Sequence, residues 1–338
     1  MKLYAGIDLH ASNNYIGVID DNDNRLLSKK VNNDMVTVLE ALAPFKENIE
    51  GVIVESTYNW YWLVDGLQEE GYHVHLANPA QIQQYNGKKY TDDKWDSFWL
   101  AHMKRLNILP EGYIYPKENR PVRDLLRRRM MYVRQKTSHI LSLESMINRN
   151  CGLHISNKDI KKLTDADLGT MFEHRSLIYA AKSNLETIRF FDEKIKGIEK
   201  EIVSQAELDK DFELLQTMPG VGKILSLTIM LEVGDITRFA RVNNYSSYCC
   251  CVKSERLSNN KKKGANNSKN GNRYLAWAYI EAAIFAINWY PEIKRYYQKK
   301  LAKTNRFVAV KTIAHKLARA SYFIMRDKVP FDIKKLFF

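Results

Sequence analysis

Cysteine is scarce in this sequence of 338 residues, which contains four cysteines and no Cys-x-x-Cys pair. Three of them, Cys249, Cys250 and Cys251, are consecutive, and cysteines that are neighbours in sequence rarely pair. The sequence therefore predicts neither a disulfide framework nor a zinc site, and it favours a reducing compartment. The run itself is expected to belong to a strand or a helix built from small residues.

Long apolar runs are missing as well. No stretch comes near the roughly 20 apolar residues that a membrane-spanning helix needs. The N-terminus also lacks the basic segment followed by an apolar segment that marks a secretory signal. We therefore expect a cytoplasmic protein that has no contact with a membrane.

Acidic residues are outnumbered by basic ones. Lys and Arg together number 52 and Asp and Glu 39, so the formal net charge is +13 and the pI is about 9.3. This balance favours a polyanionic partner, most simply nucleic acid. No zinc finger or helix-turn-helix pattern is evident, which argues against direct reading of base sequence by the protein itself. The chain length predicts two or three domains.

Residues 1–110 predict an α/β domain. Short apolar runs separated by turn residues predict three strands first, near 3–7, 15–20 and 25–31. Helices and strands then alternate: helix 34–45, strand 51–56, helix 60–71, strand 72–77 and helix 92–106. This order is typical of the ribonuclease-H-like fold. An actin-like ATPase begins in the same way, but it would need glycine-rich phosphate loops in its second half, where this chain predicts long helices.

Four carboxylates are expected to converge in this domain. Asp8 lies in the first strand, Glu55 ends the strand expected beside it, and Asp93 and Asp96 are one helical turn apart. A buried, unpaired carboxylate costs several kcal/mol, so Asp8 either faces a cation or merely ends its strand by accepting backbone hydrogen bonds. Ribonuclease-H-like nucleases hold two divalent metals with such a set, and Mg²⁺ or Mn²⁺ suits its oxygen ligands. Asp92 is predicted to lie on another helical face.

Residues 118–207 predict a helical coiled-coil region after the linker 108–117. Apolar residues recur every seven positions, at Leu126, Val133, Ile140 and Ile147 in one helix and at Ile188, Ile195 and Ile202 in another over 175–206. An antiparallel coiled coil, a contact between subunits or a plain helical hairpin would each explain this repeat. The stretch "RDLLRRRMMYVRQK", which contains Arg127, Arg128 and Arg129, is expected to contact nucleic-acid phosphates.

Residues 211–338 predict a mostly α-helical C-terminal domain that begins with a helix-hairpin-helix. Its turn "PGVG" contains Gly220 and Gly222, and Lys223 starts the second helix. Such a turn brings backbone N–H groups close to one DNA phosphate without reading sequence. A simple corner between two helices is the alternative interpretation.

A basic segment, "CVKSERLSNNKKKGANNSKNGNRYLAWAYIEAA", begins at Cys251. Basic residues between Lys253 and Arg273 far outnumber the one acid, Glu255, and the composition predicts a loop until a helix starts near Asn272. A loop of this kind can wrap a phosphodiester. The predicted phosphate contacts in it are Lys261, Lys262, Lys263, Lys269 and Arg273.

Along essentially its whole length, the sequence resembles insertion-sequence transposases that have a DEDD-type RuvC-like N-terminal domain, a group that includes the Piv DNA invertases and RNA-guided recombinases. The matching motifs are "GIDLH", "VIVESTYNWYWLVDGL", "YTDDKWDSFWLAH", "LPEGYIYPK", "RDLLRRR", "PGVG", "SERLSNNKKKG" and "KNGNRYLAWAYIEAA". The chain departs from the family pattern at two places. Ser97 stands where the family usually has alanine, and Asn259 and Asn260 follow Ser258 where the family usually has a glycine shortly after the serine.

The resemblance implies a DNA-cleaving and DNA-joining enzyme. Asp8, Glu55, Asp93 and Asp96 would be its metal ligands, and Ser258 would attack DNA to form a phosphoserine link, with Ser254 as the reserve candidate. Serine is a poor nucleophile until something stabilises its alkoxide, and the carboxylate-bound metal could do so if the domains meet within one chain or between subunits. The implied partners are the element's DNA ends, target DNA, a guide RNA and further copies in a dimer or tetramer.

Two other functions are compatible with the same residues. A metal-dependent junction nuclease that cuts by water attack would need the four carboxylates but not Ser258. A nucleic-acid-binding protein that has decayed from a transposase would be expected to have lost a carboxylate, and all four are present.

Overall fold

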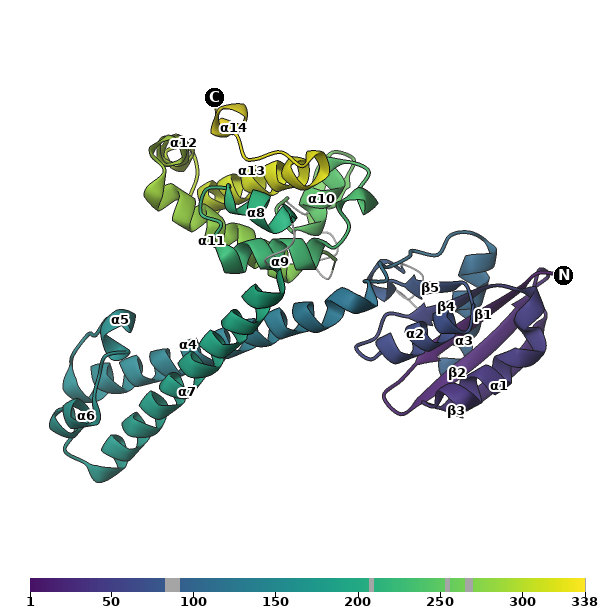
Figure 1. Cartoon of the computed structure of the whole chain (residues 1–338), viewed down its shortest axis with the longest axis horizontal. Coiled ribbons are helices and arrows are strands. Elements are labelled where there is room, and N and C mark those ends of the chain that lie inside the picture. The colour runs from purple at the N-terminus through teal and green to yellow at the C-terminus, as the bar shows by residue number, and fades with distance from the viewer. Residues whose placement is uncertain (83–91, 207–209, 253–255, 265–269, 338) are drawn as a thin grey trace. The chain divides into compact units, whose positions relative to one another are not determined.

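The computed structural model describes the whole chain except residues 83–91, 207–209, 253–255, 265–269 and 338 (Figure 1). It divides into two compact units, of which the first comprises Met1–Lys117 with Arg256–Asn270 and the second Glu118–Glu255 with Gly271–Phe338. The predicted regions 118–207 and 211–338 thus both fall largely within the second unit. Within the described residues, every helix is too short or too polar to cross a membrane.

The first unit is built on a five-stranded mixed sheet whose strand order is β3-β2-β1-β4-β5. The strands are β1 (Leu3–Leu9), β2 (Asn13–Asp20), β3 (Arg25–Asn32), β4 (Ile49–Glu55) and β5 (Val74–Ala77). The first three are antiparallel, and β4 and β5 then run parallel to β1. The helical elements are α1 (Met35–Leu42), η1 (Ala43–Asn48), α2 (Tyr61–Glu69), η2 (Pro79–Gln81) and α3 (Asp93–Arg105). The predicted α/β domain and its element order are confirmed.

Two strand glycines let α3 lie close to the sheet. A Cβ atom on Gly6 of β1 would come 1.9 Å from the backbone oxygen of Ser97 on α3, and a Cβ on Gly17 of β2 would come 2.8 Å from the Ser97 Oγ. Ser97 is fully buried, and its hydroxyl donates to the Lys94 carbonyl within its own helix. A small residue is therefore required at position 97, and serine meets that need. The close contact sets the first turn of α3 beside the end of β1.

The second unit contains a long helical hairpin formed by α4 (Arg120–Cys151) and α7 (Arg175–Ala206) (Figure 1). The two helices are antiparallel, because the pairs Arg129–Glu199 and Lys136–Asp192 run in opposite directions along them. The predicted positions Ile140, Ile147 and Ile188 are buried in the seam. The short elements around the hairpin are η4 (Lys117–Asn119), α5 (Asn157–Ile160) and α6 (Asp165–Met171).

The rest of the second unit is helical, as predicted. Its elements are α8 (Lys210–Gln216), α9 (Lys223–Val233), η5 (Ile236–Arg238), α10 (Val242–Tyr248), α11 (Arg273–Trp289), α12 (Pro291–Leu301), α13 (Arg306–Asp327) and α14 (Ile333–Phe337). They share one apolar core, inside which the hydroxyl groups of Tyr245, Tyr279 and Ser321 hydrogen-bond to one another. Every buried hydroxyl of this trio thus has a partner, as a low-dielectric core requires.

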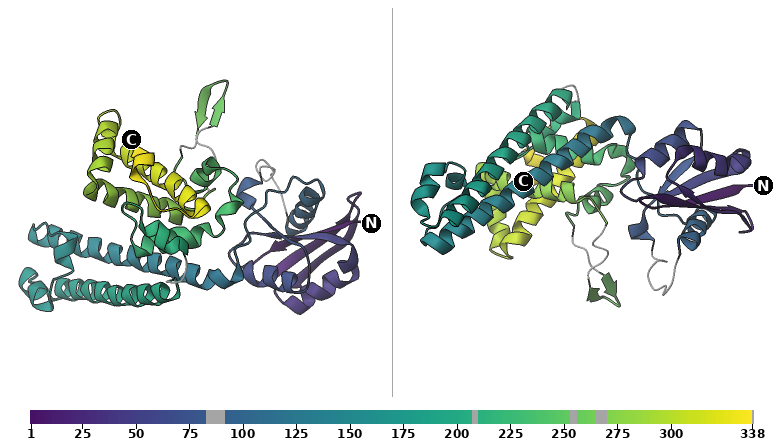
Figure 2. Two further views of the ribbon diagram at one scale, coloured as in Figure 1. Left: turned by 45° about the horizontal axis from the view of Figure 1, so that its top comes forward. Right: turned by 90° about the horizontal axis from the view of Figure 1, so that it is seen from below.

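The basic segment contains a β-hairpin, so the prediction of a continuous loop up to Asn272 is wrong here. Strands β6 (Arg256–Ser258) and β7 (Lys261–Gly264) pair in antiparallel fashion (Figure 2). Asn259 and Asn260 form the two-residue turn with φ angles of 51° and 57°. Positive φ at both central residues is the signature of a type I′ turn, which asparagine tolerates well. The cysteine prediction is also wrong, since Cys249 caps α10 and Cys250 has a φ of 53°.

Candidate active site

Acidic side chains from β1, β4 and α3 meet at one end of the sheet. Asp8 lies in β1 and is only 4% exposed. Glu55 is the last residue of β4, the parallel neighbour of β1, and its carboxyl lies close enough to that of Asp8 for the Asp8 charge to raise the pKa of Glu55. Asp93 and Asp96 occupy the first turn of α3, and Asp96 lies near enough to Glu55 to act on its charge. The structure therefore brings together the four carboxylates that the sequence singled out.

Asp92 has a different task, but it lies just before the helix and not, as the sequence had predicted, on another face of it. It is the N-cap of α3, and its side chain accepts a hydrogen bond from the Trp95 backbone N–H at 2.7 Å. Such a cap satisfies one of the helix's unpaired N–H groups. Asp92 thereby fixes the start of the turn from which Asp93 and Asp96 project.

His10 joins the carboxylates, although the sequence analysis missed it. Its Nε2 atom lies 3.1 Å from Asp8 Oδ2 and 3.3 Å from Asp93 Oδ1. Ligand atoms of Asp8, His10 and Asp93 all lie within 4.8 Å of one another. His10 lies one residue beyond the end of β1, so no strand periodicity singles it out, and only its distances to the two carboxylates mark it as part of the site.

Electrostatics oppose full ionisation of this cluster. Burial raises the pKa of Asp8, the charge of Asp93 raises it further, and His10 opposes the shift. Burial likewise raises the pKa of Glu55 to about 7, helped by the charges of Asp8 and Asp96. The side-chain partners of Asp8 are thus His10 and Glu55, which favours a site that faces a cation over a residue that merely ends its strand.

The donor set fits a divalent metal ion. It offers carboxylate oxygens, which hard cations prefer, together with one imidazole nitrogen. A cation bound there would offset the repulsion that raises the pKa of Glu55. Asp8, Asp93, Glu55 and Asp96 are the residues able to hold it, with His10 beside them.

Ser258 ends strand β6, directly before the Asn259–Asn260 turn, and is exposed. Its partner across the hairpin is Lys261, and both Lys261 and Lys263 are also exposed. Ser254 and Lys269 lie outside the described residues. Lys262 pairs with Leu257 through the backbone. The hairpin therefore presents a serine hydroxyl in a strongly basic neighbourhood.

The three arginines predicted to contact nucleic-acid phosphates differ in their exposure to solvent. Arg127 forms a two-pronged ion pair with the buried Glu232, and Arg129 pairs with Glu199 of α7. Arg128 is exposed on the same helix. The side chains of Arg127 and Arg129 are thus engaged within the protein, whereas Arg128 faces solvent.

The turn between α8 and α9 gives its two glycines different roles. Gly220 has a φ of +77°, and a Cβ there would come 2.1 Å from the Ala282 carbonyl oxygen of α11. Packing against α11 therefore requires glycine at this position. Gly222 caps α9 and is exposed, as are Lys223 and, at the start of α11, Arg273.

Together, the α/β unit and its acidic cluster place the chain among α/β proteins whose carboxylate site fits a divalent metal. Comparison with known proteins then gives the family. A transposase model of the DEDD type matches residues 5–151, and one described as "Transposase IS116/IS110/IS902 family" matches residues 212–298. The chain belongs to this transposase family.

Individual relatives agree with this assignment. The chain is 34% identical over 229 residues to the transposase for insertion sequence element IS1111A of Coxiella burnetii, an alignment that covers 67% of this chain and 62% of that protein. It is 23% identical over 294 residues to the pilin gene-inverting protein of Moraxella bovis, covering 83% of this chain and 81% of that protein. The chain thus spans somewhat less than two thirds of the Coxiella transposase.

Proposed function

We propose that this protein is a transposase that cleaves and rejoins the DNA of an insertion sequence. The observation that carries the proposal is the convergence of Asp8, Glu55 and Asp93 with His10 at one end of the sheet. The family match and the relatives named for transposition and gene inversion support the same function. The strand order also supports a ribonuclease-H-like fold for this unit.

The carboxylate cluster would supply the metal site. Mg²⁺ or Mn²⁺ bound there would activate the attacking oxygen and stabilise the leaving oxygen of a phosphodiester. Asp8, Asp93, Asp96 and Glu55 would bind and orient that ion. Burial of Asp8 and the short distance between Asp8 and Asp93 suit this task, because they hold the ligand oxygens in place before any ion arrives.

Ser258 is the proposed nucleophile. Its Oγ would form a bond to phosphorus while the phosphorus–oxygen bond to the neighbouring sugar breaks. The serine proton would leave with a base or water, and the departing sugar oxygen would take up a proton. In the second transfer a sugar hydroxyl attacks the phosphoserine and releases Ser258 unchanged. Exposure at the end of β6, beside Lys261 and Lys263, supports this assignment because a phosphate could approach the hydroxyl there.

Nucleic acid would be held mainly through its backbone. The exposed cations Arg128, Lys223, Lys261, Lys263 and Arg273 support phosphate contacts. The turn between α8 and α9 is proposed to act as a helix-hairpin-helix through the exposed N–H end of α9. Base pairing with a guide RNA encoded by the element would then select the DNA, and a dimer or tetramer would bring two DNA ends together.

The test is a search for a covalent protein–DNA adduct. The full chain is incubated with Mg²⁺ or Mn²⁺, the RNA flanking the element and a labelled junction of the element's ends, and is then denatured. We expect label on the wild-type protein and on the exposed-serine control Ser204→Ala, but none on Ser258→Ala or Asp8→Asn. Cleavage without an adduct, retained in Ser258→Ala and lost in Asp8→Asn, would instead establish a nuclease that uses water.

A further inference from the structure

The two ends of the serine segment are fastened together. The chain leaves the helical core after α10 and returns at Gly271 and Asn272. The Asn272 backbone N–H donates to the Tyr248 carbonyl at 2.6 Å. Gly271 has a φ of +96°, and a Cβ on it would come 2.9 Å from the same carbonyl oxygen and 2.5 Å from Cys250 Sγ. The segment that carries Ser258 therefore starts and ends at one point of the second unit, which we call the segment base (Tyr248, Cys250, Gly271 and Asn272).

Both the oxygen and the nitrogen of the Asn272 side-chain amide form hydrogen bonds. Its Oδ1 accepts hydrogen bonds from the Tyr274 and Leu275 backbone N–H groups, which caps α11. Its Nδ2 donates to Glu232 Oε2 at 2.7 Å. A cap alone uses only the oxygen, and serine or aspartate would serve that purpose equally well. The amide nitrogen gives asparagine its second contact, with Glu232.

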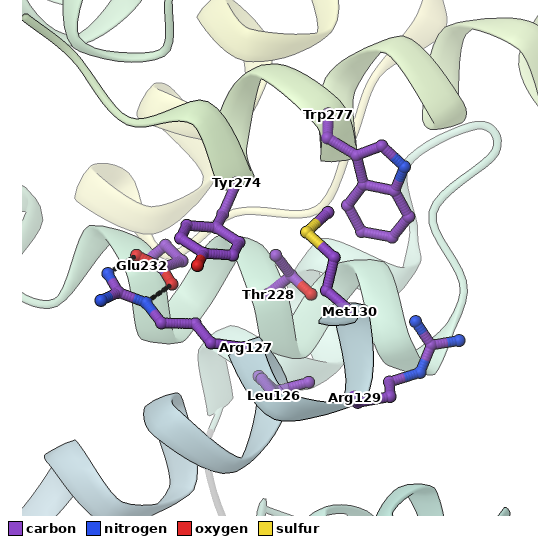
Figure 3. Close-up of a pocket in the computed structure, with 8 residues that line it drawn as sticks. All are labelled: Leu126, Arg127, Arg129, Met130, Thr228, Glu232, Tyr274 and Trp277. Carbon is purple, nitrogen blue, oxygen red and sulfur yellow. Dashed lines mark hydrogen bonds and ion pairs between the residues drawn. The ribbon is translucent and has the colours of Figure 1, made fainter. Parts of the chain in front are cut away.

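Glu232 joins the segment base to α4. It lies on α9 and is 2% exposed. Besides Asn272, it accepts hydrogen bonds from Arg127 Nε at 2.7 Å and Arg127 Nη2 at 2.8 Å (Figure 3). The Arg127 guanidinium also lies over the Tyr274 ring, with its central carbon 4.7 Å from the ring centre. One buried carboxylate therefore ties together α4, α9 and the start of α11.

Stability alone gives a weak reason for such a group. A buried ion pair often contributes no more to folding than apolar side chains of the same size, because both charges lose their hydration. What it does provide is a fixed direction, since a two-pronged arginine–carboxylate contact tolerates little displacement. The carboxylate that Arg127 holds in this way also accepts the hydrogen bond from Asn272, the residue at which the serine segment rejoins the core.

We propose that Glu232 is a positioning residue for strand transfer: with Arg127 and Asn272, it fixes on α4 and α9 the segment base to which the chain carrying Ser258 is joined at both ends. This inference rests on the proposed function of Ser258. It also gives Arg127 a role inside the protein, while Arg128 beside it remains available for phosphate.

The test compares two matched double variants of the full chain. Arg127→Met/Glu232→Met replaces both charged residues of the contact between Arg127, Glu232 and Asn272, which we call the clamp, by apolar side chains of similar volume. Arg129→Met/Glu199→Met does the same to an ion pair two residues further along α4, which joins α4 to α7 and has no contact with Asn272. Hydrogen exchange of the backbone N–H group of residue 272 is measured in the absence of DNA. Adduct formation is measured in its presence.

We expect the Arg127/Glu232 variant to keep its melting temperature within a few degrees. Its Asn272 amide should exchange about tenfold faster, the loss expected for one fixed hydrogen bond, and its adduct should form about tenfold more slowly. The Arg129/Glu199 variant should match wild type in both measurements. Asn272→Ser, which keeps the cap of α11 but cannot reach Glu232, should behave like the Arg127/Glu232 variant.

Unchanged exchange and unchanged adduct formation in the Arg127/Glu232 variant would overturn the proposal. Equal losses in the Arg129/Glu199 variant would overturn it too, because any break in the α4 ion pairs would then suffice. Exchange needs neither DNA nor serine chemistry. A wild-type protein that forms no adduct would therefore count against the nucleophile, while the exchange data would still decide on the clamp.

Discussion

Glu55→Gln should stabilise the protein at alkaline pH in the absence of metal. Glu55 is crowded by Asp8 and Asp96, and burial raises its pKa from 4.5 to about 7. Because the folded protein binds this proton more tightly than the unfolded chain does, the group favours folding below pH 4.5. That contribution is lost as the pH rises through about 7. Glutamine has no charge to lose, so it removes this penalty.

The size of this effect on stability follows from the rise in the pKa of Glu55. A rise from 4.5 to about 7 corresponds to about 3 kcal/mol, since each pKa unit is worth about 1.4 kcal/mol. Glu55 is only partly buried, and solvent screening lowers this figure. We therefore expect Glu55→Gln to raise the free energy of unfolding by about 1–2 kcal/mol at pH 8 and to leave it nearly unchanged at pH 4.

Urea denaturation with EDTA at the two pH values measures this difference. Tryptophan fluorescence is a suitable signal because Trp60, Trp62, Trp95 and Trp99 all lie in the first unit. Glu40→Gln, on the exposed face of α1, is the matched control and should change little at either pH. The reasoning is refuted if Glu55→Gln unfolds at lower urea than wild type at pH 8, or if the gap between them does not depend on pH.

Three further substitutions test the site and its support. His10→Gln should weaken Mn²⁺ binding, measured by calorimetry, about tenfold more than Mg²⁺ binding, because an imidazole nitrogen suits the softer ion; equal losses would mean that His10 is no ligand. Gly6→Ala should cost about 2 kcal/mol or more in urea denaturation, since its methyl group would meet the Ser97 carbonyl, whereas Gly169→Ala, with open space around it, should be neutral or stabilising. Asp92→Ala should cost about 1 kcal/mol through loss of the α3 cap, and Asp92→Ser should restore most of it. A cost that persists in the serine variant would show that Asp92 does more than cap the helix.

The carboxylate set was predictable because its signals are local. Asp8 interrupts an apolar strand, Glu55 ends the strand beside it, and Asp93 and Asp96 share a helical face. Strand order brings the first two together, and the packing of α3 on the sheet adds the other two. His10 could not be singled out in the same way, since a lone histidine after a strand is ordinary. Only the distances to Asp8 and Asp93 mark it as part of the site.

Contacts between residues that are far apart in the sequence could not be predicted from it. Arg127 belongs to a run of arginines with the same local composition, and nothing near it in sequence indicates that Glu232, 105 residues away, takes up its charge while Arg128 stays exposed. The β6–β7 hairpin was missed for another reason. Its strands are short and rich in lysine, so composition predicts a loop, and the signal that does exist is the Asn259–Asn260 pair, which suits a type I′ turn.

The closed base of the serine segment makes it an exchangeable cassette. Because the chain leaves and rejoins the core at one point, through Tyr248 and Asn272, residues can be added or removed between them without moving a helix. Doubling the length of such a loop costs only about 0.6 kcal/mol in closure entropy. Evolution, or an engineer, can therefore lengthen or swap the cassette while the helical core keeps its sequence.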